Sequence, residues 1–352
     1  MESTKLFLPF FSLFFTLSLL SGLGLARHHH HQHRHLQLSK LFVFGDLYVD
    51  TGNTSPSDPN YPKTPYGVTF PGHPDGRFSN GRVLTSYAAR ILGLKSPIPY
   101  RVVEKEGVEG AKDGVNFAYG GTGVFKTGYD LPTMTTQIDF LQHLIANSTF
   151  TPQDINSSFA LVSVSGNDYS YYLSTNGSIK GFIPLIVRVV KQIGVNLKRI
   201  HSLGVKKISI TALGPLQCVP EITSSSDFKH CNSSLALLVD FHNLLLRQAV
   251  DKLNKETNDA PFFILDLHAA FLSIIQNKGD PQGSIKFATP LQPCCHGTSR
   301  GYYCGSVDED GQKKYVLCED PNSAFFWDDV HPTQQGWIAA LTFLISAMKQ
   351  HV

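Results

Sequence analysis

Short apolar segments alternate with longer segments of helical periodicity from Lys40 to the C-terminus. The apolar segments are rich in valine, isoleucine and phenylalanine and are bounded by Gly, Pro, Asn or Asp, which is typical of strands. Such short apolar runs suit strands that are buried in a parallel sheet. The predicted strands are Leu41–Phe44, Val115–Tyr119, Phe159–Val164, Lys207–Ala212 and Phe262–Asp266.

Two of the intervening segments carry apolar residues at steps of three and four, which places one apolar stripe on a helix. The stripes are Ile186, Val190, Ile193, Leu197 and Ile200 in the first segment, and Leu238, Phe241, Leu245, Ala249 and Leu253 in the second. Further helices are predicted around Arg82–Leu92 and from about Thr333 to Lys349. Residues 54–80 contain six prolines and are predicted to form a long surface loop that shapes a binding site.

Strands that alternate with helices predict an α/β protein. Because crossover connections are right-handed, the expected architecture is a three-layer, doubly wound, mostly parallel five-stranded sheet with helices on both faces, similar to the flavodoxin fold. No internal repeat or clear linker interrupts residues 39–352, so these residues are expected to form a single domain.

The N-terminus has the pattern of a secretory signal peptide over residues 1–26. Lys5 precedes an apolar run from Leu6 to Leu20, and Gly24-Leu25-Ala26 provides small residues for cleavage. A membrane anchor is the alternative, but the run is shorter than the roughly 20 residues that span a bilayer, so no stable membrane insertion is expected after cleavage. Residues 27–38 hold six histidines and are expected to form a disordered tail, with loose binding of metals or anionic surfaces as the alternative.

The composition is that of a globular protein with a large core. Of the 352 residues, 42% are hydrophobic and 16% are charged, and the formal net charge is +2. The small net charge argues against nucleic acid as a partner, because phosphate binding needs a basic excess.

Six cysteines in a secreted chain predict disulfides. Cys218 and Cys231 are close in sequence and are expected to pair, whereas adjacent cysteines such as Cys294 and Cys295 rarely bond to each other. The pairing within the second group stays open, and a zinc site there is the alternative; this group is Cys294, Cys295, Cys304 and Cys318.

Asn-x-Ser/Thr sequons agree with secretion. The predicted glycan acceptors are Asn147, Asn156, Asn176 and Asn232. Asn53 also matches the pattern, but Pro56 follows closely, and the use of Asn53 is not expected.

Ligands of an open parallel sheet bind outside the carboxyl ends of the strands. The segments that follow three predicted strands, together with one segment near the C-terminus, are therefore the candidates for chemistry. They are residues 45–53, 119–123, 165–168 and 327–333.

In this order, the four segments resemble the sequence blocks of the GDSL, or SGNH, hydrolases, and the plant-type members are the most similar. The resemblance runs from about Lys40 to the C-terminus and includes Asp75-Gly76-Arg77-Phe78-Ser79-Asn80-Gly81-Arg82, Gly114-Val115-Asn116-Phe117-Ala118-Tyr119-Gly120-Gly121 and Gly214-Pro215-Leu216-Gln217-Cys218. It implies an SGNH-hydrolase-like fold and an esterase or lipase that acts on acyl or lipid esters through Ser-His-Asp chemistry, with no metal or organic cofactor.

The resemblance also implies roles for individual residues. His331 is the expected general base, and Asp328, three residues earlier, is expected to orient it, with Asp329 as a rival. The expected oxyanion donors are the backbone N–H groups of Leu47 and Gly121 and the side-chain amide of Asn167.

The chain departs from the family at the nucleophile, because Gly45-Asp46 is followed by Leu47 instead of serine. Leucine has no nucleophilic atom and no proton to give to a base. Thr51 is a remote substitute, and the elbow-like motif Gly297-Thr298-Ser299-Arg300-Gly301 lies inside the cysteine group, outside the strand–turn–helix setting that such a motif needs. Loss of the nucleophile costs serine hydrolases on the order of 10⁶ in turnover, so little or no hydrolysis is expected.

The sequence thus predicts a secreted, extracellular or cell-wall protein, derived from an esterase, that binds a small acyl ester, a lipid or a wall component as a monomer. A vacuolar destination is the alternative location. An active ester hydrolase or acyltransferase that uses water or another nucleophile is the alternative function, and an unrelated structural or interaction protein is the third.

Overall fold

The computed structural model describes residues 38–257, 259–276 and 286–351. The predicted signal peptide and nearly all of the histidine-rich tail lie outside these residues. Leu38, the last residue of the predicted tail, is buried, and the N–H of Ser39 donates to the carbonyl of Ser157. The packed fold therefore includes at least one residue of the predicted tail.

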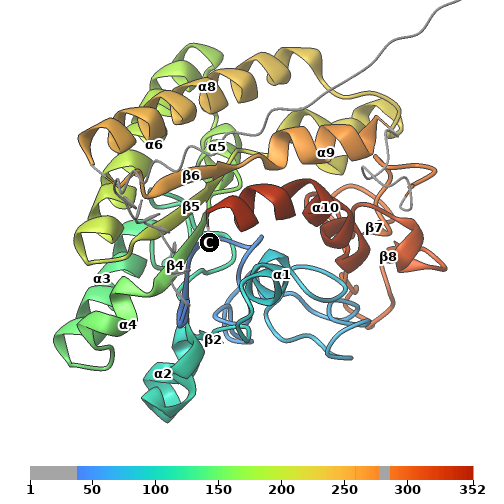
Figure 1. Cartoon of the computed structure of the whole chain (residues 1–352). Helices are drawn as coiled ribbons and strands as arrows, with labels where there is room; N and C mark the ends of the chain where they lie inside the picture. The colour runs from blue at the N-terminus through green and yellow to red at the C-terminus, as the bar shows by residue number, and fades with distance from the viewer. Residues whose placement is uncertain (1–37, 258, 277–285, 352) are drawn as a thin grey trace, which may run out of the picture. The chain divides into compact units, whose positions relative to one another are not determined.

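The core of the fold is a parallel sheet with strand order β2-β3-β1-β4-β5-β6 (Figure 1). Its strands are β1 (Lys40–Gly45), β2 (Ile98–Pro99), β3 (Gly114–Asn116), β4 (Ser158–Ser163), β5 (Lys207–Thr211) and β6 (Phe262–Leu265). The α/β class and the parallel sheet are confirmed, but the sheet has six strands instead of five. The missed strand, β2, spans two residues and includes a proline, so it carries no periodic signal.

Alternate residues of the strands face two separate apolar layers. Phe42 and Phe44 of β1 contribute to the first layer, and Leu41 and Val43 contribute to the second. In Figure 1, α6 and α8 lie side by side on one side of the sheet, and α1 and α10 lie on the other. The predicted three-layer arrangement is therefore confirmed, because each face of the sheet is covered by its own helices.

The first layer is covered by α3 (Met134–Ala146), α6 (Ile179–Ser202) and α8 (Ser233–Glu256). The predicted stripe of α6, from Ile186 to Ile200, is buried throughout. The predicted stripe of α8 packs against this layer, but apart from Leu253 its residues are only partly buried. The buried residues of that helix are Val239, His242, Asn243, Leu246, Val250 and Leu253. Asn243 is buried because its side chain bonds both backbone groups of Leu213, and such a polar contact does not show as apolar periodicity.

The second layer is covered by α1 (Leu84–Ile91), α9 (Leu267–Ile275) and α10 (Gln334–Gln350). The bounds of α1 and α10 agree with the predicted helices, and the side chain of Thr333 caps α10 by accepting from the N–H of Gly336. The shorter helices are α2 (Tyr100–Glu106), α4 (Pro152–Asn156), α5 (Asn167–Ser174) and α7 (Pro220–Thr223). Residues 54–80 form turns and extended segments without a helix or strand, as predicted.

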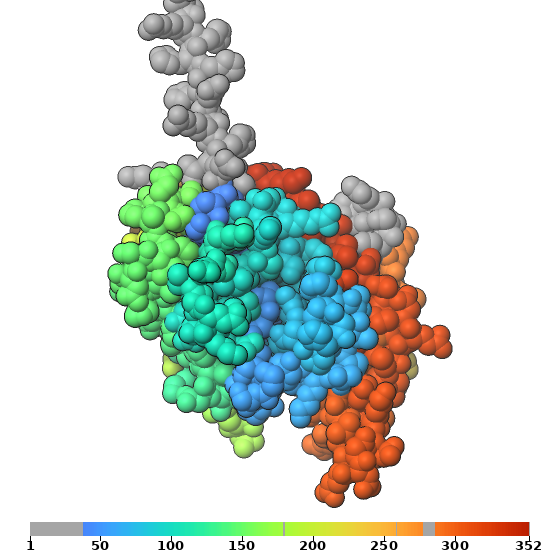
Figure 2. Space-filling model, turned by 90° about the horizontal axis from the view of Figure 1, so that it is seen from below, coloured from blue at the N-terminus to red at the C-terminus, as the bar shows by residue number. Residues whose placement is uncertain are grey.

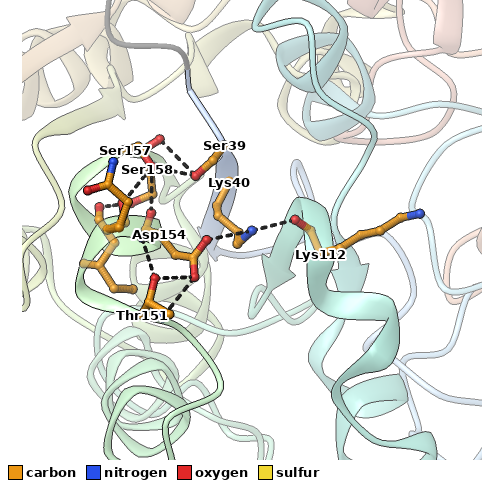
Figure 3. A network of polar contacts seen from close by, with 9 residues as sticks. Ser39, Lys40, Lys112, Thr151, Asp154, Ser157 and Ser158 are labelled. Atoms are coloured by element: carbon orange, nitrogen blue, oxygen red, sulfur yellow. Dashed lines mark hydrogen bonds and ion pairs between the residues drawn. The ribbon is translucent and has the colours of Figure 1, made fainter.

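Both ends of β1 are tied to neighbouring elements. At its start, Nζ of Lys40 lies 3.0 Å from a carboxylate oxygen of Asp154 and donates to the carbonyl of Lys112 at 2.8 Å (Figure 3). At its end, the side chain of Gln137 on α3 accepts from the N–H of Gly45 at 2.7 Å and donates to its carbonyl at 2.9 Å. The residues that follow Gly45 are therefore held in place from behind.

Gly45 is also constrained by its own backbone, which has a φ of +131°. A Cβ at this position would collide with the carbonyl of Ser163 on β4. We expect Gly45→Ala to lower the free energy of unfolding by about 3 kcal/mol or more, because neither the backbone nor the strand can move away. The control is Gly194→Ala on α6, where a Cβ meets nothing within 4 Å and the change is expected to stabilise by about 0.5–1 kcal/mol. Urea unfolding of both variants measures the difference, and equal stabilities would contradict this account.

A disulfide-bonded segment packs against the long loop. It contains the antiparallel strands β7 (Cys295–Gly297) and β8 (Tyr315–Leu317). Figure 2 shows the orange surface of this part of the chain beside the light-blue surface of the residues near 60–85. The predicted pair Cys218–Cys231 is confirmed, and the open pairing resolves into Cys294–Cys318 and Cys295–Cys304.

Within the described residues, no helix has the length and apolar character needed to cross a bilayer. The four predicted glycan acceptors are exposed, whereas Asn53 is buried and its amide donates to the carbonyls of Asn116 and Ala118. Glycan attachment and the boundaries of the single domain stay predictions.

Candidate active site

The candidate site lies at the carboxyl end of β1, where the strand order of the sheet changes direction. After β1 the chain builds β2 and β3 on one side of it and then crosses to β4 on the other. Such a switch point leaves a crevice outside the strand ends, which is where open α/β sheets bind ligands. The segments after β1, β3 and β4, all singled out in the sequence, therefore converge here.

Asp46 ties the end of β1 to the segment after β4. One of its carboxylate oxygens accepts from the backbone N–H of Ser165 at 2.6 Å and from the Ser165 hydroxyl at 2.7 Å. Burial raises the pKa of Asp46 to about 7, although the hydrogen bonds from Ser165 oppose this increase. Next to it, the hydroxyl of Tyr48 donates to the carbonyl of Val330 at 2.9 Å, which attaches the end of β1 to the loop that carries His331.

His331 and Asp328 form a buried pair. Nδ1 of His331 lies 2.7 and 2.8 Å from the two carboxylate oxygens of Asp328. The carboxylate also accepts from the backbone N–H groups of Val330 and His331 at 2.9 and 2.8 Å. The hydroxyl of Tyr66 in the long loop donates to it at 2.5 Å.

These contacts decide the charge of Asp328. Burial alone would raise its pKa, but His331 and the hydrogen bonds from Tyr66 and Val330 lower the pKa below its ordinary value. For Tyr66, burial and the neighbouring Asp328 carboxylate raise the pKa well above its ordinary value. The arrangement holds an anion against Nδ1 and leaves Nε2 of His331 without a hydrogen-bond partner among the described residues.

The segment Asp75–Arg82 positions the histidine loop from the outside. The ring of Phe78 lies 5.2 Å from the His331 ring, measured between centroids. The hydroxyl of Ser79 donates to the carbonyl of Pro332 at 3.0 Å, and the side-chain oxygen of Asn80 accepts from the N–H of Gln334 at 2.7 Å. This segment therefore fixes both the imidazole and the start of α10.

Of the expected oxyanion donors, the structure brings Leu47 and Asn167 to the same cavity. The side-chain amide of Asn167 donates to the carbonyl of Thr122 at 2.7 Å, so the segments after β3 and β4 are in direct contact. Gly121 precedes Thr122 and has a φ of +82°, but it does not line this cavity. Gly121 is therefore adjacent in sequence to the residue whose carbonyl accepts from Asn167.

Two adjoining cavities meet at Glu221 and Val330. The first, of about 240 Å³, is lined by Leu47 and Asn167 and by aliphatic and aromatic residues, including Leu173, Phe182, Leu216, Val219, Ile222 and Leu235. The second, of about 270 Å³, is lined by His331, Asp328, Tyr66 and Phe78. Leu47 and His331 therefore face neighbouring compartments of one crevice.

The other candidates for a nucleophile are differently placed. The hydroxyl of Thr51 is buried and accepts from the side chain of Asn116 at 2.8 Å. Ser299 is exposed in the turn region between β7 and β8, so the elbow-like motif has no strand–turn–helix setting. Among the described residues, no group of three or more His, Cys, Asp or Glu could hold a metal ion.

Asp329, the rival candidate for orienting His331, differs from Asp328 in the direction of its pKa shift. Burial and the neighbouring carboxylates of Asp328 and Glu221 raise the pKa of Asp329 to about 7. An aspartate whose pKa is higher in the folded state stabilises the fold fully below its ordinary pKa, and this contribution is lost as the pH rises to about 7.

We therefore expect Asp329→Asn to be more stable than the parent at pH 8 by about 2 kcal/mol, roughly half of what such a shift implies without solvent screening. At pH 3, below the ordinary pKa of an aspartate, the two proteins are expected to have similar stability, because Asp329 is then largely protonated in both states. Thermal unfolding across this range tests the expectation, and a constant difference at all pH values would contradict it.

Several residues of the site could not be found in the sequence. Tyr66 lies among six prolines in a loop without periodicity, and Gln137 lies 92 residues from the glycine that it holds. Glu221 follows the block Gly214–Cys218 but matches none of the segments that were compared. Within the long loop of residues 54–80, only the block that begins at Asp75 was indicated as part of the site, and the indication came from the family resemblance.

Comparison with known proteins decides the family. Residues 41–340 match the family described as GDSL-like Lipase/Acylhydrolase. The chain belongs to this family. A GDSL esterase/lipase of Arabidopsis thaliana is 52% identical over 87% of this chain and 86% of its own length, and a second is 48% identical over 89% of both chains. A third, from the same plant, is 41% identical over 94% of this chain and 95% of its own length.

Membership of the GDSL esterase/lipase family confirms the resemblance drawn from the four blocks. The match begins at Leu41 in β1 and ends within α10, so it includes every segment that forms the crevice. The family is one of esterases and lipases, and Leu47 lines a cavity of that crevice.

Proposed function

We propose that this protein is a secreted member of the GDSL esterase/lipase family that binds an acyl ester and hydrolyses it weakly or not at all. Leu47 occupies the position of the attacking serine, Asp328 and His331 are the former acid–base pair, and Leu47 N–H, Gly121 and Asn167 are the oxyanion donors. The observation that carries the proposal is the aliphatic side chain of Leu47 at the end of β1, in the wall of the cavity that also holds Asn167.

The state of His331 supports an incomplete catalytic set. In a working site, Nε2 takes the proton of the serine hydroxyl, so base and nucleophile are within hydrogen-bond reach. Here Nδ1 is held by Asp328 and Nε2 has no hydrogen-bond partner among the described residues. Nε2 is thus available to accept a proton, and the side chain of Leu47 has none to supply.

The cavity beside Leu47 supports binding of an acyl chain. Its lining combines six aliphatic or aromatic side chains, from Leu173 to Leu235 in sequence, with the polar groups of Ser165 and Asn167 near Leu47. Apolar pockets with a few polar groups at one end suit ligands with a polar head and an apolar tail. An ester carbonyl near Leu47 would direct its acyl chain toward these apolar residues.

Secretion is supported by two independent features. The three disulfides are typical of proteins that mature in an oxidising compartment. The exposure of all four candidate glycan acceptors is compatible with glycosylation on that route. We infer an extracellular or cell-wall location.

Binding and hydrolysis are tested with the parent protein. Calorimetric titration with methyl octanoate is expected to show binding, while p-nitrophenyl octanoate is expected to be hydrolysed no faster than by the buffer. Leu173→Glu, at the cavity wall, is expected to weaken binding about tenfold or more, because it places a charge beside the acyl chain. Leu244→Glu on α8 is the matched control, because both leucines are 46% exposed and only Leu173 lines the cavity. Absence of binding, or equal loss in both variants, would refute the proposal.

A second candidate function, weak hydrolysis through Ser165, is favoured by one contact. The Ser165 hydroxyl lines the same cavity and donates to Asp46 at 2.7 Å, and an aspartate whose pKa is raised to about 7 can accept a proton. A fluorophosphonate probe distinguishes the two functions. The first predicts no labelling of the parent, and the second predicts a label on Ser165 that Ser165→Ala abolishes.

A further inference from the structure

A groove of about 530 Å³ opens on the side of His331 that is away from the acyl cavity. It is formed by residues 59–63, by residues 301–307 and by Tyr66 and Phe78. Four of its lining residues are tyrosines, namely Tyr61, Tyr66, Tyr302 and Tyr303, and two are prolines, Pro59 and Pro62. We call it the tyrosine groove. The function assigned to the site so far does not use it.

The two walls of the tyrosine groove lie close to each other although they are more than 200 residues apart in sequence. Gly305 has a φ of +83°, and a Cβ there would lie 2.9 Å from the carbonyl of Thr64. The disulfide Cys295–Cys304 attaches the second wall to β7. A groove of this kind is preformed, which lowers the entropic cost of binding a ligand.

The tyrosine groove is continuous with the proposed site. Tyr66, Phe78, Tyr303 and Cys304 line both the groove and the cavity that contains His331. Tyr66 also donates to Asp328. A ligand in the groove would therefore lie next to the imidazole, opposite the acyl chain.

The chemistry of the tyrosine groove differs from that of the acyl cavity. Tyrosine offers a flat apolar ring together with a hydroxyl that can donate and accept. Asn60 adds a polar group: its Nδ2 donates to the carbonyl of Gly120, and its Oδ1 is shielded from solvent without a hydrogen-bond partner among the described residues. Lys63 is exposed at the edge.

A sugar ring matches these features, because it presents apolar C–H faces to aromatic rings and hydroxyls at its edge to polar groups. A second fatty chain does not, since it would leave Oδ1 of Asn60 without a hydrogen-bond partner. If an ester bond lies beside His331, its acyl chain would occupy the acyl cavity and its alcohol part would occupy the tyrosine groove. Resting on the proposed function, we propose that the tyrosine groove binds the alcohol part of the ester and that this alcohol is a sugar.

Three esters with the same acyl chain test the proposal on the parent protein: 6-O-octanoylglucose, methyl octanoate and phenyl octanoate. Titration calorimetry below the critical micelle concentrations is expected to show that the glucose ester binds about tenfold more tightly than either of the others. Tyr303→Ala and Asn60→Ala are expected to remove most of this preference, because they weaken binding of the glucose ester much more than binding of methyl octanoate. Tyr303 is 64% exposed, so its loss does not affect the core.

The control variant is Tyr171→Ala on α5, an exposed tyrosine outside the tyrosine groove, which is expected to keep the preference. Equal affinities for the glucose and methyl esters would overturn the sugar proposal while the proposed function stands. Tighter binding of phenyl octanoate would replace the sugar with a phenolic alcohol. A preference that survives in Tyr303→Ala and Asn60→Ala would place the sugar elsewhere. If none of the three esters binds, the proposed function itself fails, and the assignment of the groove fails with it.

Discussion

Leu47→Ser is expected to hydrolyse p-nitrophenyl octanoate at least ~10³-fold faster than the parent protein. Loss of the nucleophile costs serine hydrolases on the order of 10⁶ in turnover, so restoring a serine is expected to recover a large part of that factor. A serine at position 47 would follow Asp46 at the end of β1, where Gln137 fixes Gly45 and Ser165 fixes Asp46. The proton acceptor, Nε2 of His331, has no hydrogen-bond partner among the described residues.

Leu47→Ala is the matched control for this gain. It removes the bulk of the leucine without supplying a nucleophile, so it is expected to stay inactive while binding methyl octanoate at least as well as the parent. The fluorophosphonate probe is expected to label Leu47→Ser at residue 47 and not to label Leu47→Ala. A folded Leu47→Ser protein that neither turns over the ester nor reacts with the probe would show that the geometry, and not only the nucleophile, has been lost.

The gain is not expected to reach the full activity of the family. The amide of Asn167 is already engaged with the carbonyl of Thr122 at 2.7 Å, and it must give part of that contact to an oxyanion. Gly121 lies next to Thr122, so a small movement of this turn would bring both donors toward the ester. Such a movement costs turnover, since preorganised donors are what make an oxyanion hole effective.

The sequence predicts well those parts of the fold that depend on local apolar pattern. Five strands and the stripe of α6 are evident because each is a continuous or periodic apolar run that must be buried. The sequence did not indicate the strand β2 or the most buried face of α8, and the two reasons differ. Ile98–Pro99 is too short to show a pattern, and the buried face of α8 includes Asn243 and His242, which are held by hydrogen bonds to Leu213 and Tyr169.

In the candidate site, too, residues in local motifs could be indicated from the sequence, whereas residues that act through distant contacts could not. His331, Asp328 and Leu47 could be singled out as candidates from sequence blocks, because each lies in a short contiguous motif. The residues that support them could not, since Tyr66 lies 262 positions from Asp328 and Ser165 lies 119 positions from Asp46. Contacts over such separations are consequences of the strand order, and the sequence alone does not specify which loops meet.

In the Leu47→Ser background, the loss of His331 or of Asp328 function is expected to abolish most of the gained activity. His331→Ala removes the proposed general base, so turnover is expected to fall by roughly 10³-fold or more, to the level of the parent. Asp328→Asn is expected to cost on the order of 10⁴ or to reach the same floor, because an amide NH₂ group facing Nδ1 favours the wrong tautomer. Steady-state kinetics on p-nitrophenyl octanoate measures both.

Tyr66→Phe in the same background tests whether Tyr66 acts through its hydrogen bond to Asp328 or through packing of its ring. It removes one hydrogen bond to Asp328 and leaves the bonds from His331 and the two backbone N–H groups, so turnover is expected to fall only about tenfold. The Tyr66 hydroxyl helps to lower the pKa of Asp328, and a carboxylate with a lowered pKa stabilises the fold until the pH falls through that value. In Tyr66→Phe the pKa of Asp328 is higher, so acid unfolding and the acid limb of the activity profile are both expected to begin at a higher pH than in Leu47→Ser alone. If Tyr66→Phe lowered turnover without moving the acid limb, Tyr66 would act by packing against Trp327 and not through the carboxylate.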